Sequence, residues 1–152
     1  MNVSIYSREK IEQFLSENTP ENVAVISFYD PPSMETGEND NAPYDYSDKI
    51  HRVFQVAVED IYYDELEDYG MSYVEFFPQA DDLAKFIMQA ENDGFDFICQ
   101  CEYGQSRSAG CAAAILEYFY NEGINIFADY RYCPIQMIFH KVYDALKRYN
   151  DK

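Results

Sequence analysis

Hydrophobic residues recur along this chain with two spacings, one typical of strands and one typical of helices. Three short apolar runs, rich in β-branched and aromatic residues, predict buried strands at 22–29 (NVAVISFY), 51–58 (HRVFQVAV) and 95–101 (FDFICQC). Elsewhere, apolar residues recur every three or four positions, as on one face of a helix. This spacing predicts helices at 7–17, 77–92, 107–121 and 134–149.

Strands that alternate with helices predict an α/β fold with a central, mostly parallel sheet flanked by helices. Residues 30–48 carry three prolines, a glycine and many acids, which predicts a mobile surface loop. Residues 59–75 are acidic and rich in tyrosine and predict a connecting loop, and 125–128 predict a short strand or a turn. The 152 residues, of which 47% are hydrophobic, fit a single domain, 1–152.

The composition is strongly acidic, with 28 aspartates and glutamates against 11 lysines and arginines and a formal net charge of -17. We expect no binding to nucleic acids or anionic membranes, because both depend on basic residues. No apolar run is long enough to cross a bilayer, no secretory leader is evident, and four cysteines are too few for a disulfide scaffold. These features predict a cytoplasmic protein. Any anion that it binds must be held by local groups that overcome the overall field.

The most informative segment joins the third predicted strand to the next helix. The strand ends at Cys101, Gly104 lies in the five residues that follow, and Arg107 begins the helix (CEYGQSRS). Such a loop directs backbone N–H groups into one concavity, and the arginine fork matches two phosphate oxygens. The same positive field favours the thiolate form of Cys101 and makes it a candidate nucleophile, to which the hydroxyl of Ser108 could donate. The alternative is an inert, buried strand cysteine.

These eight residues resemble the phosphate-binding loop of the cysteine-based protein tyrosine phosphatases, most closely in their compact dual-specificity-like branch. The order of strands and helices is similar to that family's fold over most of the chain. The resemblance implies phosphomonoester hydrolysis through a phosphocysteine on Cys101, with Arg107 holding the phosphoryl oxygens and Ser108 easing hydrolysis of the intermediate. It implies that the phosphate-binding loop consists of Glu102, Tyr103, Gly104, Gln105, Ser106 and Arg107.

The resemblance also implies a general acid, an aspartate upstream of the nucleophile that protonates the leaving group. The predicted loop after the second strand offers Asp60, Asp64 and Asp68, and we favour Asp60 because it lies just past that strand (VEDI). For each of the three, a solvated surface acid is the simpler interpretation. Gln100 departs from the family pattern, which usually has histidine there. An uncharged residue at this position predicts a thiol that is harder to ionise and a modest activity.

The favoured hypothesis is a cysteine-dependent phosphatase that needs no metal and no cofactor. Its expected substrates are a phosphorylated protein, a peptide or a small aryl phosphate. Two alternatives remain: a catalytically weak pseudophosphatase that binds phosphate or phosphopeptide, and another thiolate enzyme such as a sulfur transferase or an arsenate reductase. Cys99 or Cys111 could form a disulfide with Cys101 under oxidation, although core packing explains both more simply. Candidates to line a slot for an aromatic ring are Tyr62, Tyr63, Tyr69 and, best placed, Tyr103.

Overall fold

The computed structural model describes residues 1–32, 37, 42–47 and 49–151, and the rest lie outside the described part of the chain. Part of the predicted mobile loop at 30–48 falls on residues that are not described. The elements, in chain order, are β1 (Val3–Tyr6), α1 (Arg8–Glu17), β2 (Val23–Tyr29), β3 (Arg52–Ala57), the 3-10 turns η1 (Tyr63–Glu65) and η2 (Glu67–Tyr69), α2 (Ala80–Asn92), β4 (Asp96–Gln100), α3 (Arg107–Tyr120), α4 (Ile124–Phe127) and α5 (Gln136–Asn150).

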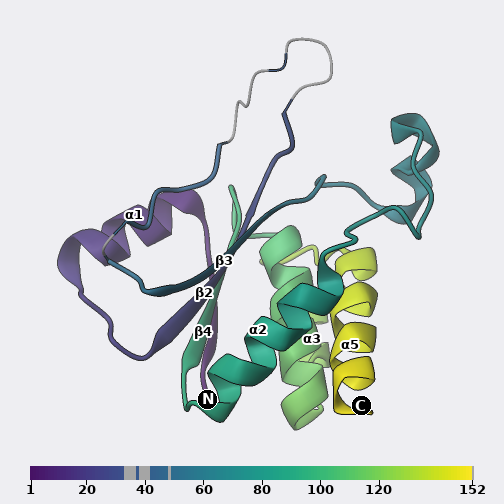
Figure 1. Ribbon diagram of the computed structural model, residues 1–152. Coiled ribbons are helices and arrows are strands. Elements are labelled where there is room, and N and C mark those ends of the chain that lie inside the picture. The colour runs from purple at the N-terminus through teal and green to yellow at the C-terminus, as the bar shows by residue number, and fades with distance from the viewer. Residues whose placement is uncertain (33–36, 38–41, 48, 152) are drawn as a thin grey trace.

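The described strands form one parallel sheet in the order β1-β4-β2-β3, and helices cover both of its faces. Figure 1 shows α1 on one face and α2, α3 and α5 on the other. This arrangement confirms the α/β prediction. Because β2 and β4 are the inner strands, their residues alternate between two apolar layers. This explains why the sequence of each strand is a nearly continuous hydrophobic run. No helix among the described residues is long and apolar enough to cross a bilayer.

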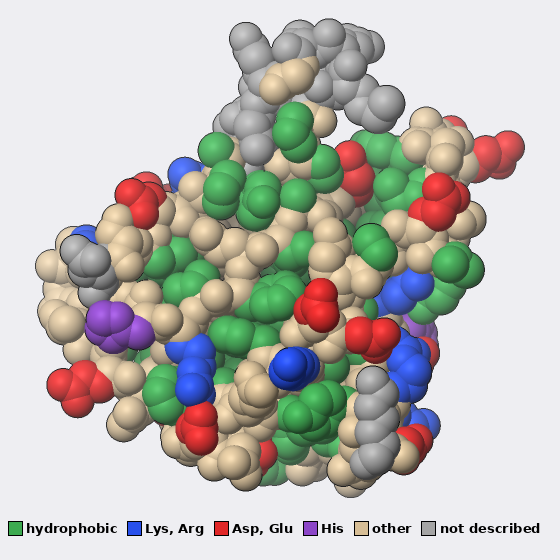
Figure 2. All heavy atoms as spheres, viewed as in Figure 1, with side chains coloured by type: hydrophobic (Ala, Val, Ile, Leu, Met, Phe, Trp, Pro, Cys, Tyr) green, Lys and Arg blue, Asp and Glu red, His purple; other side chains and the backbone are tan. Residues whose placement is uncertain are grey.

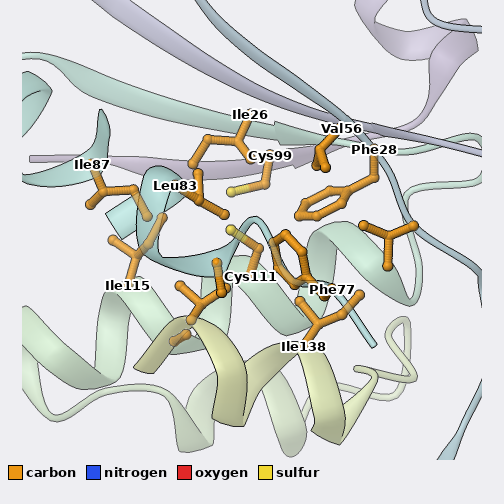
Figure 3. Close-up of a cluster of buried hydrophobic side chains, with 14 of the residues drawn as sticks. Ile26, Phe28, Val56, Phe77, Leu83, Ile87, Cys99, Cys111, Ile115 and Ile138 are labelled. Atoms are coloured by element: carbon orange, nitrogen blue, oxygen red, sulfur yellow. The ribbon is translucent and has the colours of Figure 1, made fainter. Parts of the chain in front are cut away.

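The larger apolar layer lies between the sheet and the three helices of one face. Figure 3 shows side chains from the sheet meeting those of α2, α3 and α5: Ile26, Phe28, Val56 and Cys99 on the sheet, and Leu83, Ile87, Cys111, Ile115 and Ile138 on the helices. The smaller layer packs Ile11 and Leu15 of α1 against Val25 and Ile98. Burial of these side chains against both faces fixes the carboxyl edge of the sheet, from which the candidate site is built.

The buried cysteines belong to the larger layer. Cys99 and Cys111 are fully buried, and their sulfurs lie close together between β4 and α3 (Figure 3). Burial raises the pKa of the Cys111 thiol well above its ordinary value, and the neighbouring Cys99 raises it further. Both residues are therefore core cysteines that face each other, as the simpler interpretation of the sequence holds.

Four details differ from the sequence predictions. The pattern does not indicate β1, because a strand of four half-buried residues is too short to show a clear period. The alternative of a strand at 125–128 is wrong, because Ile124–Phe127 form one helical turn. The predicted loop at 59–75 contains the two short turns η1 and η2. The predicted helix start at residue 77 is also wrong: Phe77 has a φ of 53°, a left-handed conformation that cannot continue into an α-helix.

Gly110 is predicted to be required for the packing of α3 against α5. A β-carbon there would lie 2.7 Å from the carbonyl oxygen of Ile135 and 3.3 Å from Cβ of Ile138. Gly110→Ala should therefore lower the free energy of unfolding by about 1–3 kcal/mol through overpacking, although alanine is the better helix former. Denaturant unfolding measures the effect, with the exposed Glu91→Ala of α2 as a control. A Gly110→Ala protein as stable as wild type would contradict this packing.

Candidate active site

The loop of residues 101–106 connects β4 to α3 at the carboxyl edge of the sheet. Its carbonyl groups are held from outside: Arg8 N–H donates to Glu102 O (3.0 Å), Cys133 N–H to Gln105 O (2.8 Å) and Ile135 N–H to Ser106 O (3.1 Å). In a trans peptide, the N–H that follows a carbonyl points the opposite way. The N–H groups after these carbonyls therefore face away from the surrounding segments, and they find no acceptor among the described residues. Unpaired donors at a helix N-terminus form an anion-binding cup.

Gly104 allows the loop to pack closely against the junction of β1 and α1. Its φ is 68°, and a β-carbon would lie 2.6 Å from the backbone nitrogen of Ser7. Any side chain would therefore be both strained and in collision with the backbone. The structure therefore requires a glycine at the centre of the sequence motif.

Cys101 lies at the base of this loop. The residue is only 2% exposed, and its Sγ lies 3.0 Å from Oγ of Ser108 in the first turn of α3. At this distance the hydroxyl can donate to a sulfur anion, which is the contact that the sequence analysis assigns to Ser108. The structure therefore brings together the predicted nucleophile and the residue predicted to assist its departure.

Arg107 is buried as deeply as Cys101, and Asp30 and Val58 hold one nitrogen of its guanidinium. Nη1 donates to Oδ1 of Asp30 (2.6 Å) and to the carbonyl oxygen of Val58 (2.9 Å), whereas the buried Nε has no partner among the described residues. The fork is thus fixed in direction and keeps donors for a bidentate contact with an anion. No motif in the sequence marks Asp30. The feature that could have indicated it is its position directly after β2, at the edge where the parallel strands end.

Asp60 lies at the rim of the loop. Its Oδ1 accepts a hydrogen bond of 2.7 Å from Oγ of Ser106. Asp64 and Asp68, the other two candidates, are exposed in the turns η1 and η2, and in the described part of the chain no hydrogen bond or ion pair joins them to the loop. Glu59 also lies beside the site: burial raises the pKa of its carboxyl, as does Asp30, while the charge of Arg107 opposes them.

Behind the loop, Gln100 belongs to a buried network without formal charge. Its Oε1 accepts from Oγ of Ser27 (2.6 Å) and from the hydroxyl of Tyr46 (2.8 Å), and its Nε2 donates to the carbonyl oxygen of Cys101 (3.0 Å). Burial raises the pKa of Tyr46 above its ordinary value, so that the phenol remains neutral. The network holds the Cys101–Glu102 peptide plane from the side opposite the cup, and directs Glu102 N–H away from Gln100.

The tyrosines proposed to line a slot lie in different surroundings. Tyr103, in the loop itself, is 71% exposed and borders a hollow of about 390 Å³ between the loop and α1. The hydroxyl of Tyr62 donates to the carbonyl oxygen of Cys133, beside the loop (3.1 Å). Tyr63 instead stacks on Tyr73, with 5.6 Å between ring centroids. Of the four, Tyr62 and Tyr103 have the clearest placement beside the loop.

The network around Gln100 makes a prediction about stability. Gln100→Leu leaves the hydroxyls of Ser27 and Tyr46 without their buried acceptor, which should lower the free energy of unfolding by about 1–3 kcal/mol. Tyr46→Phe should cost less in the Gln100→Leu background than in wild type, because its hydrogen bond is already lost. Gln55→Leu, which removes an exposed amide-to-carbonyl bond, is the control. Strict additivity of Gln100→Leu and Tyr46→Phe in denaturant unfolding would refute the coupling.

Comparison with known proteins places this fold among phosphatases. No family model matches the sequence, and no curated protein matches it. Solved structures do match. PTPMT1 in complex with PI(5)P has a TM-score of 0.55 and 16% identity, covering 99% of this chain and 93% of that one. The human tyrosine phosphatase-like serine/threonine/tyrosine-interacting protein has a TM-score of 0.52 and 13% identity, and the match covers 95% of this chain and 87% of that one. The PTP-2 phosphatase of Cydia pomonella has a TM-score of 0.52 and 12% identity, and the match covers 95% of this chain and 85% of that one. The chain therefore has the fold of the cysteine-based tyrosine and dual-specificity phosphatases.

Proposed function

We propose that this protein hydrolyses phosphomonoesters through a phosphocysteine intermediate on Cys101, as a dual-specificity-like phosphatase. The observation that carries the proposal is the guanidinium of Arg107, clamped on one side by Asp30 and Val58, with its Nε unpaired beside the loop. A buried cation with free donors stabilises a phosphoryl group in the ground state and, more strongly, in the transition state. Cys101 at the base of the same loop supplies the nucleophile.

In the first step the thiolate of Cys101 attacks phosphorus, an S–P bond forms and the ester P–O bond breaks. Asp60 donates its proton to the departing oxygen. In the second step water attacks phosphorus, Asp60 takes a proton from it, and the S–P bond breaks to release phosphate and the thiolate. Ser108, 3.0 Å from Sγ, donates to the sulfur as it leaves. The contact between Asp60 and Ser106 supports Asp60 over Asp64 and Asp68.

A phosphate-binding protein with little turnover is the second candidate, and the uncharged Gln100 favours it. The side chains that Gln100 contacts among the described residues, Ser27 and Tyr46, carry no positive charge. Inorganic phosphate protects the fold against heat in both cases, because any ligand of the native state does so. Only an enzyme also releases phosphate from an aryl phosphate in repeated turnovers.

Cys101→Ser and Arg107→Ala should each abolish the hydrolysis of a small aryl phosphate, with kcat/KM reduced at least about a hundredfold. The serine hydroxyl is a much weaker nucleophile than a thiolate, and the alanine variant lacks the cation. Continuous release of the coloured phenol measures the rate. Arg148→Ala, which breaks a surface ion pair with Asp81, is the matched control. Full turnover in the serine variant would exclude the phosphocysteine.

The general acid is tested by the dependence on the leaving group. Asp60→Asn should lower kcat about 10²- to 10⁴-fold for an alkyl or phenyl phosphate, whose leaving oxygen needs a proton, and much less for an aryl phosphate with an acidic phenol. Asp64→Asn and Asp68→Asn make the same change on the neighbouring turns and should leave both rates within about twofold of wild type. If Asp64→Asn or Asp68→Asn showed the leaving-group dependence instead, the assignment of Asp60 would be wrong.

A further inference from the structure

The segment between β3 and α2 stands out from the body of the molecule. We call residues 59–75 the acidic arm. Seven of its 17 residues are aspartate or glutamate, four are tyrosine, and none is lysine or arginine. Figure 1 shows it as the teal segment that projects at the right of the view, and Figure 2 shows acidic and apolar side chains together at the same place. Ile61, Leu66, Met71 and Tyr73 attach the arm to the larger apolar layer, whereas its acids Asp64, Glu67 and Asp68 are exposed and have no obvious part in the stability of the fold.

The arm is continuous with the candidate active site. It begins with Glu59 and Asp60, and Asp60 bonds to Ser106 of the loop. Tyr62 bonds to Cys133, whose own N–H holds the carbonyl of Gln105. Because β3 and β4 are parallel, the arm and the loop leave the sheet at the same edge. A peptide bound with its phosphate in the loop would therefore have the arm at the same edge of the sheet.

The side chains of the arm suit a cationic partner. Tyr69 and Val74 are 49% and 80% exposed, and Tyr62 and Tyr63 are exposed as well. Burial, followed by the charges of Glu59 and Glu65, raises the pKa of Tyr69, so this ring lies in the field of the acids beside the site. Aromatic faces surrounded by carboxylates attract lysine and arginine through both charge and cation–π contacts.

Two basic residues near the arm and the loop behave accordingly. The ammonium of Lys141 from α5 lies 4.1 Å from the ring centroid of Tyr73, which shows a cation held on an aromatic face of the arm. Arg131, between α4 and α5, is paired with Asp129 at 2.7 Å. Neither residue neutralises the exposed acids of η1 and η2.

The opposite flank of the loop is acidic as well. The hollow of about 390 Å³ beside Tyr103 is lined by Glu9, Glu12 and Glu102, together with Ser7 and Arg8. Arg8 is itself 3.7 Å from the carboxylate of Glu102 and donates to the carbonyl of Ala42. A phosphorylated segment thus meets carboxylates on both sides of the loop that holds its phosphate.

We propose that the acidic arm selects phosphoprotein segments in which lysine or arginine residues flank the phosphorylated residue. This proposal rests on the proposed function, since it places the phosphate in the loop of Cys101 and Arg107. A phosphate dianion approaching a chain of net charge -17 is repelled, and basic neighbours turn that repulsion into attraction. The same field disfavours acidic phosphopeptides and surfaces crowded with phosphate.

The test compares phosphotyrosyl peptides that are identical except for their flanking residues, which are arginine, glutamine or glutamate. At low salt, kcat/KM should be at least about tenfold higher with arginine than with glutamine, and lowest with glutamate. The difference should shrink as salt screens the charges. Equal kcat/KM for the three peptides would overturn the proposal. So would faster hydrolysis of a phosphoinositide in anionic vesicles than of the arginine peptide.

Variants that replace acids with uncharged amides then test whether the arm causes the preference for arginine. A triple variant of the arm, Asp64→Asn with Glu67→Gln and Asp68→Asn, should reduce the arginine-to-glutamine ratio several-fold and leave a small aryl phosphate unaffected. The matched control changes three exposed glutamates at the opposite edge of the sheet: Glu21→Gln, Glu91→Gln and Glu122→Gln. It alters the net charge equally and should retain the ratio. An equal loss in both triple variants would show an effect of net charge alone and overturn the role of the arm.

The binding of the same peptides to Cys101→Ser, measured by fluorescence anisotropy, separates this proposal from the proposed function. A preference for arginine without any turnover of the wild-type protein would support the arm and contradict the enzyme. Turnover of the aryl phosphate without a preference would support the enzyme and contradict the arm.

Discussion

An ion pair between the buried Arg107 and the partly buried Asp30 organises the candidate site. Burial of a guanidinium is costly, and the cost is offset only where carboxylate and carbonyl oxygens meet its donors. Here Asp30, directly after β2, and the carbonyl of Val58, directly after β3, bind the same nitrogen. Because the cation is the first residue of α3, this single pairing ties two strand ends to the helix that follows β4. The geometry of the candidate site therefore depends on the whole carboxyl edge of the sheet.

The pairing also explains how an acidic protein can offer an anion site. Asp30 and Glu59 lie near Arg107, and burial, followed by the charge of Asp30, raises the pKa of Glu59, while Arg107 opposes both effects. What remains for a ligand is local and directional: the unpaired Nε of Arg107 and the backbone N–H groups at the start of α3. Hydrogen bonds act at contact distance, whereas the repulsion of a net charge is spread and screened by salt. Under the proposed function, such short-range donors hold a phosphate that the molecule as a whole repels.

The sequence predicts most of the framework and the centre of the site. The inner strands are apolar on both faces, so their runs are unambiguous, and Asp60 lies three positions after the end of β3, at the edge where the loop must lie. Other features depend on tertiary contacts that local patterns do not encode. Asp30 lies 77 positions from Arg107, and Tyr46 lies 54 positions from Gln100 in a segment without regular structure. The left-handed backbone of Phe77 shortens α2 although its residue type favours no such conformation.

Gln100 determines how the thiol at the base of the loop is supported. Its amide holds the carbonyl of Cys101, and Ser27 and Tyr46 hold the amide, so the peptide that begins the cup is oriented without any ionised group. The positive field on the sulfur must then come from the loop amides and from Arg107, whose charge is already shared with Asp30. Because the site has little positive charge that is not already paired, a ligand that carries positive charge gains the most affinity. The neutral network behind the cysteine and the acidic arm in front of it thus have the same consequence under the two proposals: the additional positive charge near the phosphate comes from the substrate.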